Sequence, residues 1–309
     1  MTKLSLLFMK THVNHSRYSS IYVIYFIVLI LAIISTTSTA KELITINEIQ
    51  GKSERHSYTQ ELLIAVLDST VDSHGEYTIQ TLAHLNAPRT SSMLRRREGY
   101  GDIVQGATRK DWEAHLLPIK IPIMKGVLGL RVLLIRKDRQ PEFTAINSLE
   151  QLKEKFGAVT SYWSITEIFE HYKFNIVKTN RQDSMFAMLE KRRFDYVSRG
   201  INEVLIEYEQ FKPQNPNLHI ENNLLVNIPL PVYFFVNPNK PHLAARIEVG
   251  LKEIINNGVF DSIFIKHFKG KFQQLNLLER KVFELKNPNL TSPYYLYKLD
   301  EFKLLFADK

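Results

Sequence analysis

Cysteine is absent from this chain of 309 residues. Without cysteine the protein has no disulfide, no thiolate metal site and no lipid-modified cysteine. Its stability must therefore come from a packed core. The residues after position 40 are numerous enough for two lobes, because domains commonly contain about 100–200 residues.

Signatures of catalysis and of metal binding are also missing from the sequence. The ten histidines are scattered, and none forms an HExxH pair or stands beside acids at the spacing of metal ligands. There is no GxSxG motif and no glycine loop to cradle a phosphate. Gly99 and Gly101 lie in EGYGD, which is typical of a turn. The sequence therefore predicts a protein that is not an enzyme and that holds no metal or cofactor.

The charge of the chain is only mildly basic, with 40 lysines and arginines against 32 acids. The arginine run at residues 95–97 interrupts a helical pattern and lacks the interleaved aromatic residues of a nucleic-acid platform. We interpret this run as a solvated face and predict no nucleic-acid partner.

The first 40 residues have the pattern of a secretory signal peptide. Lys3, Lys10 and Arg17 precede an apolar stretch at residues 21–34, and small residues follow it. Ser38 and Ala40 stand as in a small-x-small cleavage site. The apolar stretch is shorter than the roughly 20 residues that span a bilayer, although an uncleaved anchor is the alternative. We expect cleavage after Ala40 and a periplasmic protein.

Two apolar stretches far apart in the sequence organise the remainder of the chain. Residues 130–135 and 224–236 are rich in β-branched, leucine and aromatic side chains, and each ends at turn-forming residues. Between them lies a block of about ninety residues, a usual size for a small domain. This order predicts two lobes joined by two crossing strands. We assign residues 41–132 to lobe one, 133–228 to lobe two, and 229–309 to the return part and tail of lobe one.

Strands and helices alternate in both lobes, which favours an α/β fold rather than a β-sandwich. In the first lobe we expect strands at 43–47, 78–82 and 102–104 and helices at 58–67 and 91–97. The apolar face of the helix at 58–67 consists of Leu62, Leu63, Val66 and Leu67. In the second lobe we expect strands at 156–159, 176–178 and 194–197 and helices at 148–155, 183–189 and 203–211, with Ser148 as an N-cap. An amphipathic helix at 243–256 and a short helix after it follow the return crossing.

Three segments carry a resemblance to a known family: LEQLKEKFGAVTSYW, MLEKRRFDYVSRGINEVLIE and LAARIEVGLKEIINNGVFDSIF. Their order and spacing resemble those of the family 3 periplasmic solute-binding proteins, the amino-acid-type receptors of the two-lobed type 2 periplasmic-binding fold. The resemblance implies a monomer whose lobes close by a hinge on a small polar, amino-acid-like solute. It also implies an inner-membrane partner, either the permease of an ABC-type transporter or a sensor protein.

The residues that hold the ligand in this family are only partly matched here. Such receptors bind the ligand carboxylate with an arginine just after a Thr or Ser, because a guanidinium matches a carboxylate with two hydrogen bonds. The aligned position holds Asp111 or Trp112, whereas Arg109 directly follows Thr108. The acid that would bind the ligand ammonium aligns with Gly200, and Asn202 and Glu203 are the nearest polar residues.

Further candidates each have a functional and a structural interpretation. Tyr58 either stacks on a ligand or packs in the core. The loop at residues 160–164 offers hydroxyls and backbone N–H groups at the start of a helix, which suit an anion or a carboxylate. Arg199 and Glu203 form either a ligand clamp or an ion pair, and Arg131 either reaches the cleft or forms a salt bridge across the hinge. Asp195 is expected to be structural. The predicted ligand residues are Tyr58, Thr108, Arg109, Arg131, Thr160, Ser161, Trp163, Ser164, Arg199 and Glu203.

Two other functions remain open at this stage. The same fold can carry a dehydratase-like lyase, in which Glu203 or Asp111 would be the general base. Alternatively, the protein is a signalling module that docks on a membrane protein without any ligand.

Overall fold

The computed structural model describes residues 41–47, 54–82, 89, 92–93, 101–290 and 296–307. The expected signal peptide at 1–40 lies outside the described residues, as does most of the helix expected at 91–97. The chain divides into the units Met1–Ala40 and Lys41–Lys309, and everything below concerns the second. Within the described ranges, no helix is both long and apolar enough to cross a membrane.

The first lobe contains a five-stranded sheet. Its strands are β1 (Glu42–Asn47), β2 (Tyr77–Leu82), β3 (Ile103–Ala107), β4 (Leu117–Ile119) and β11 (Val232–Val236), in the order β2-β1-β3-β11-β4. β1 pairs in parallel with β2 and β3, whereas β11, which comes after the second lobe in the sequence, pairs antiparallel with β3 and β4. All five residues of β11 are buried, as the apolar run predicts.

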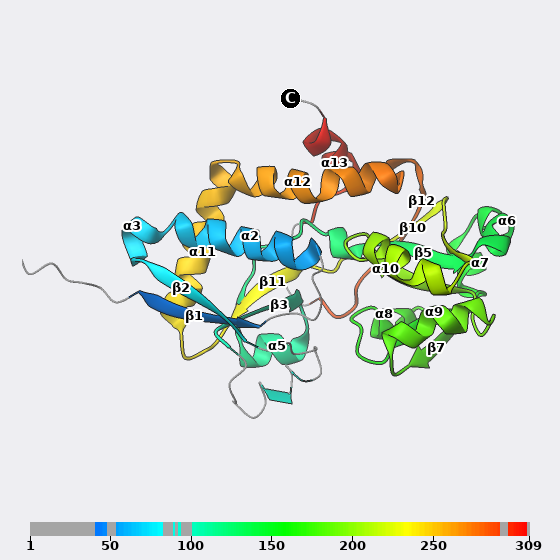
Figure 1. Ribbon diagram of the computed structural model, residues 1–309, viewed down its shortest axis with the longest axis horizontal. Coiled ribbons are helices and arrows are strands. Elements are labelled where there is room, and N and C mark those ends of the chain that lie inside the picture. Colours follow the sequence, from blue (N-terminus) through cyan, green and yellow to red (C-terminus); the bar gives the residue numbers. More distant parts are fainter. Residues whose placement is uncertain are drawn as a thin grey trace, which may run out of the picture. The chain divides into compact units, whose positions relative to one another are not determined.

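Among the described residues, the first lobe has the helices α2 (Glu54–Asp68), α3 (Val71–His74), α5 (Lys110–His115), α11 (Pro241–Asn256), α12 (Val259–Gln274) and α13 (Leu299–Phe306). The apolar face predicted for α2 is buried, with each of its four residues at most 3 % exposed. A Cβ at Gly250 of α11 would overlap the backbone oxygen of Val66, so α11 approaches α2 as closely as a glycine allows. Figure 1 shows α12 beside α2; α12 is a helix of 16 residues rather than the short helix expected.

The second lobe contains a seven-stranded sheet. Its strands are β5 (Leu130–Arg136), β6 (Gly157–Thr160), β7 (Ile176–Thr179), β8 (Tyr196–Gly200), β9 (Leu218–Ile220), β10 (Leu224–Asn227) and β12 (Lys281–Glu284). The main order is β12-β10-β5-β8-β6-β7, and β9 pairs with β5. Its helices are α6 (Gln140–Thr144), α7 (Leu149–Lys153), α8 (Thr166–His171), α9 (Gln182–Glu190) and α10 (Val204–Phe211). The predicted N-cap is confirmed, since Ser148 accepts a hydrogen bond from the Gln151 N–H at 3.3 Å and forms a capping box with it.

Two short connections link strands of the two sheets directly, and the chain crosses between the lobes again on either side of β12. The first, residues 120–129, leads from β4 to β5 and includes the 3₁₀ turn Val127–Gly129, and the second, residues 228–231, leads from β10 to β11. The expected strand at 224–236 is therefore interrupted: its halves belong to different sheets, and the break contains Pro229 and Pro231. The expected pair of crossing strands is in this structure a pair of connections between sheets.

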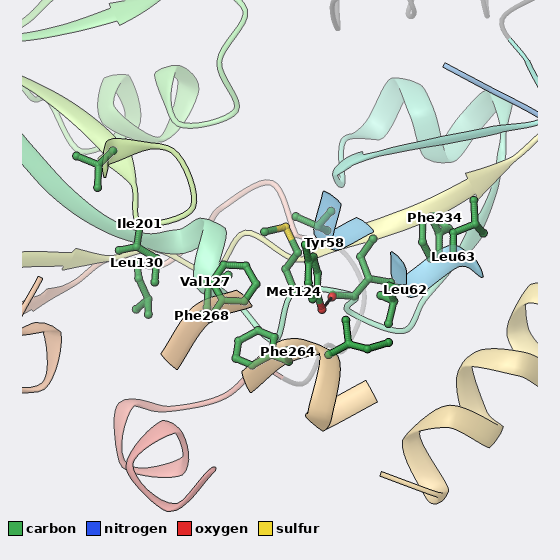
Figure 2. Packing of buried hydrophobic residues seen from close by; sticks show 14 of the residues in the cluster. Tyr58, Leu62, Leu63, Met124, Val127, Leu130, Ile201, Phe234, Phe264 and Phe268 are labelled. Atoms are coloured by element: carbon green, nitrogen blue, oxygen red, sulfur yellow. Dashed lines mark hydrogen bonds between the residues drawn. The ribbon is translucent and has the colours of Figure 1, made fainter. Parts of the chain in front are cut away.

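One hydrophobic cluster continues from the first lobe through the first connection into the second (Figure 2). Leu62 and Phe264 lie on the first-lobe side, Met124 and Val127 in the connection, and Ile201 on the second-lobe side. Because these side chains share one core, the connection is packed rather than exposed.

The sequence suggests that the tail packs on the first lobe, but only part of the tail does so. β12 pairs in parallel with β10 of the seven-stranded sheet over four residues. Among the described tail residues, α13 (Leu299–Phe306) returns to the first lobe beside α12 (Figure 1). The ring of Phe302 in α13 lies 4.9 Å from that of Phe272 in α12. The tail therefore contacts both lobes.

Candidate functional site

Arg109 is a first-lobe residue that reaches the second lobe. It precedes α5, directly after the loop in which the Thr108 N–H donates to the Pro231 carbonyl oxygen at 2.9 Å. The Thr108 hydroxyl donates to the Glu113 carboxylate. The Arg109 Nη2 donates to the Tyr162 carbonyl oxygen at 3.4 Å, and its Nε lies 3.7 Å from Asp111 Oδ1. Both distances are long, so these contacts hold the guanidinium only weakly.

Trp112 occupies one of the two positions aligned with the family's carboxylate-binding arginine, and it is a core residue. Its side chain packs edge-on against Phe235, with ring centroids 5.3 Å apart, and it is 5 % exposed. A Cβ at Gly106 would lie 2.9 Å from the indole, so the small residue in β3 makes room for the ring. The nearby positive charge is instead Arg109, whose guanidinium lies 5.9 Å from the indole centroid.

The loop between β6 and α8 faces Arg109 from the second lobe. The Thr160 carbonyl oxygen accepts hydrogen bonds from the Thr166 hydroxyl at 2.6 Å and from the Trp163 N–H at 3.2 Å. The expected free N–H at Trp163 is therefore already used within the loop. The Thr160 hydroxyl is fully buried and has no hydrogen-bond partner among the described residues. An unmade hydrogen bond of this kind costs about 1–3 kcal/mol.

The hydroxyl residues of this loop differ in exposure. Ser161 is exposed and Ser164 is half-buried. Both lie within two residues of Tyr162, whose carbonyl oxygen accepts the hydrogen bond from Arg109. The structure thus brings Thr108, Arg109 and the loop at residues 160–164 into one region.

Arg199 packs against this loop at Trp163. Its guanidinium lies 4.3 Å from the centroid of the Trp163 ring. It also forms two hydrogen bonds with Glu207, one of them at 2.5 Å, and an ion pair with Glu203. The ion-pair interpretation of Arg199 and Glu203 therefore describes their arrangement here. Glu207 was not anticipated from the sequence, although its helical spacing from Glu203 is the signal that would have indicated it.

Arg131 holds the start of β5 against β8. Its Nη2 donates to the Ser198 carbonyl oxygen at 2.7 Å and its Nη1 to the Leu128 carbonyl oxygen at 3.3 Å. It is 3 % exposed, and its Nε also donates to the Ser198 hydroxyl at 3.4 Å. A Cβ at Gly200 would lie 2.5 Å from Asn202 Oδ1 and 3.0 Å from Arg131 Nη1, so an acid cannot occupy this position without displacing them.

Tyr58 belongs to the core, which corrects the expectation that it could stack on a ligand. Its side chain is fully buried, its hydroxyl donates to the Ile123 carbonyl oxygen at 2.5 Å, and its ring meets Phe268 edge-on at 5.1 Å (Figure 2). Burial raises the pKa of the Tyr58 phenol well above its ordinary value. Asp195 is structural as expected: it pairs with Arg139 at 2.9 Å and accepts from the Phe156 N–H at 2.8 Å.

Two hollows elsewhere on the described surface lie apart from Arg109 and the loop at residues 160–164. One, of about 130 Å³, lies among Tyr208, Ile220 and Arg280, and the other, of about 310 Å³, lies between the end of α12 and α13. None of the ten predicted ligand residues lines either hollow. Among the described residues no group of three or more His, Asp or Glu side chains is placed to hold a metal ion.

Comparison with known proteins shows similarity at the level of the fold. No family model matches the chain, and no curated protein matches it. An ancestral arginine-binding protein bound to arginine is 16% identical with a TM-score of 0.53, covering 74% of this chain and 99% of its own. The probable amino-acid ABC transporter extracellular-binding protein ytmK from Bacillus subtilis is 17% identical with a TM-score of 0.54, covering 74% of this chain and 98% of its own.

A third solved structure adds a link to enzymes. The ancestral amino acid-binding protein AncCDT-1, a precursor of cyclohexadienyl dehydratase, is 14% identical with a TM-score of 0.52 and covers 73% of this chain and 95% of its own. Identities this low indicate shared architecture and not shared ligands. The chain has the two-lobed α/β fold of the periplasmic binding proteins.

Proposed function

We propose that this protein binds a small polar solute bearing a carboxylate between its two lobes. The observation that carries the proposal is the approach of Arg109 in the first lobe to the Tyr162 carbonyl oxygen in the second, at 3.4 Å. The two residues belong to loops that follow β3 and β6, and ligands in α/β proteins meet the loops at the carboxyl ends of strands.

The residues in this region have complementary roles toward a carboxylate. Arg109 offers two parallel N–H donors, and exchanging its long contacts for a carboxylate costs little. The Thr160 hydroxyl gains a missing hydrogen bond, and Ser161 and Ser164 add further hydroxyls. Trp163 offers a ring whose position is set by Arg199, so Arg199, Glu203 and Arg131 act as supports and not as ligand contacts.

The binding mechanism in this proposal is hinge closure about the two connections. A solute that contacts Arg109 and the loop at 160–164 together binds the closed arrangement better than the open one, and so shifts the population toward it. The first solute-binding lobe contains the five-stranded sheet with α11 and α12, and the second contains the seven-stranded sheet, to which the tail contributes β12. Residues 1–40 direct export to the periplasm, where a monomer delivers its closed form to an ABC-type permease or a sensor. The amino-acid-binding neighbours of the same fold support this role.

The lyase alternative has less support. Its two candidate bases both stand beside a guanidinium: Glu203 pairs with Arg199, and Asp111 lies 3.7 Å from Arg109. The fold shared with a dehydratase precursor is the observation in its favour. Mass spectrometry of each bound solute after incubation separates the two functions, because an enzyme converts its ligand.

The proposal is tested by thermal unfolding of residues 41–309 against amino acids, dicarboxylates, monocarboxylates, amines and small peptides. We expect a saturable rise in melting temperature with at least one carboxylate, because a ligand that binds only the native state stabilises it by mass action. No rise with any member of the panel, together with capture of a membrane protein without added solute, would favour the docking alternative.

A further inference from the structure

The tail of the chain contacts both connections between the lobes. On the second connection, Asn287 Nδ2 donates a hydrogen bond to the Pro229 carbonyl oxygen at 2.9 Å. On the first connection, the Tyr297 N–H donates to the Lys125 carbonyl oxygen, also at 2.9 Å. We call residues 281–290 and 296–307 the strap. The strap therefore contacts both connections, which are also hydrogen-bonded to each other where the Ile228 N–H donates to the Gly129 carbonyl oxygen.

The contacts of the Lys125 side chain with the strap and with α12 depend on its positive charge. The Lys125 ammonium lies 2.7 Å from Asp261 Oδ1 and donates to the Tyr297 hydroxyl at 2.9 Å. It also lies 4.1 Å from the centroid of the Tyr297 ring and 4.5 Å from that of Phe260. Lys125 is 7 % exposed and has a positive φ of 48°, a conformation that side chains other than glycine rarely adopt. A left-handed backbone conformation and a buried charge therefore occur together where the strap meets the first connection.

The two ends of the strap are anchored on different lobes. β12 is hydrogen-bonded to β10 in the seven-stranded sheet, and Asn289 Nδ2 donates to Glu167 of α8 at 2.8 Å. At the other end, Phe302 and Phe306 of α13 pack on α12, and the Phe302 side chain is fully buried. The strap therefore has one described end on each lobe.

We propose that the strap regulates the solute site by holding the lobes near the arrangement in which Arg109 reaches the loop at 160–164. This regulation rests on the solute-binding function proposed above. With the strap attached, the binding-competent arrangement is populated before the solute arrives. With the strap released, the lobes open further, and the apparent affinity falls in proportion to the competent fraction.

The absence of cysteine makes the lobe separation directly measurable. Asn256, at the end of α11, and Lys191, directly after α9, are exposed and lie on different lobes. Cysteines at these two positions carry spin labels for pulsed electron paramagnetic resonance, with no other thiol in the chain. The strap variant is N287A/Y297A, which removes a contact at each connection. Lys125→Met is a milder second variant, and Leu304→Ala, at a side chain 75 % exposed on α13, is the matched control.

Without any solute, we expect one narrow distance distribution for the wild-type and Leu304→Ala proteins, and a broader distribution shifted to longer distances for the strap variant. Lys125→Met should give an intermediate result. With the carboxylate found by the thermal panel, the dissociation constant of the strap variant should rise about tenfold, a typical size for coupling between sites. Circular dichroism establishes that each variant is folded.

The outcomes separate the strap from the solute site. Unchanged distance distributions in both folded variants would overturn the strap, whatever solute the wild type binds. A broadened distribution with an unchanged dissociation constant would overturn its regulatory role. If no carboxylate binds the wild type, the proposed function fails, and the distances measured without solute still decide whether the strap holds the lobes.

Discussion

Gly129 of the first connection and Ile228 of the second are in direct backbone contact. The Ile228 N–H donates a hydrogen bond to the Gly129 carbonyl oxygen at 3.0 Å, and a Cβ at Gly129 would overlap the Ile228 carbonyl oxygen. The two connections therefore behave as a single packed unit at this point. Movement of the lobes must take place by bending on either side of this contact, because the contact itself has no room to adjust.

We predict that Gly129→Ala destabilises the protein by about 1–3 kcal/mol, the usual cost of overpacking. The neighbouring atoms are backbone and cannot rotate away, so the connections must separate. Urea unfolding monitored by circular dichroism measures the loss. Gly270→Ala is the control, since a Cβ there meets nothing within 4 Å and alanine favours the α12 helix by about 0.5–1 kcal/mol. Equal stability of the two variants would contradict the close contact.

The ion pair of Arg199 with Glu207 gives a second prediction. Arg199 is 5 % exposed and Glu207 is 9 % exposed. Glu207→Ala therefore leaves the buried guanidinium of Arg199 with Glu203 as its remaining described acidic partner. Removing one partner of such a pair costs about 3–5 kcal/mol. Because Arg199 lies against Trp163, tryptophan fluorescence should change together with stability.

A surface pair provides the control for that experiment. Lys252 and Glu248 form an i,i+4 pair at 2.6 Å with side chains 62% and 49% exposed. Lys252→Ala should therefore change the free energy of unfolding by less than about 1 kcal/mol. A loss in Glu207→Ala no larger than that in Lys252→Ala would show that the Arg199 pair contributes little.

The lowered pKa of Glu142 predicts that part of the protein's stability is lost in acid. Hydrogen bonds from Arg139 and then from Lys155 lower the pKa of Glu142 from its ordinary 4.5 to about 2. Because the pKa of the folded state lies below that of the unfolded state, the stabilisation is complete above about pH 4.5 and is lost as the pH falls toward 2. The Glu142 side chain is 39% exposed, so solvent screening limits the effect to about 1 kcal/mol or less. Urea titrations measure the free energy of unfolding at pH 6 and at pH 3. The loss of this free energy between the two pH values should be smaller in Glu142→Gln than in the wild type. An equal loss in both proteins would assign the acid sensitivity to other groups.

Local features of the fold could be predicted from the sequence because they depend on neighbouring residues. The apolar face of α2 follows from helical spacing, and the capping box at Ser148 needs only the next three residues. Pro229 and Pro231 mark an interruption between β10 and β11 in the sequence, but the sheet of each half could not be predicted, because an apolar run does not reveal which sheet will bury it. The packing of the two connections determines that β10 and β11 enter different sheets.

The candidate site was less predictable than the fold, because its residues meet through distant parts of the chain. Tyr58 is suited to stacking by its residue type, but α12, some 200 positions later, buries it. Arg109 and Tyr162 are 53 residues apart, and no local pattern connects them. The choice of Arg109 as a ligand residue rests on residue chemistry alone and stays a prediction, whereas the aligned Trp112 is a buried core residue.

Arg109→Gln gives the most direct test of the solute site. Hydrogen bonds to charged groups are worth about 1.5–3 kcal/mol, so losing the guanidinium should weaken binding of a carboxylate by about 10- to 150-fold. The fold should be unaffected, because the contacts of Arg109 with Tyr162 and Asp111 are long. Lys110→Gln removes an exposed positive charge from the adjacent residue and is the matched control. Isothermal titration of both variants separates a specific carboxylate contact from general electrostatic attraction: equal losses would indicate that only the net charge matters, whereas a loss confined to Arg109→Gln assigns the carboxylate to this guanidinium.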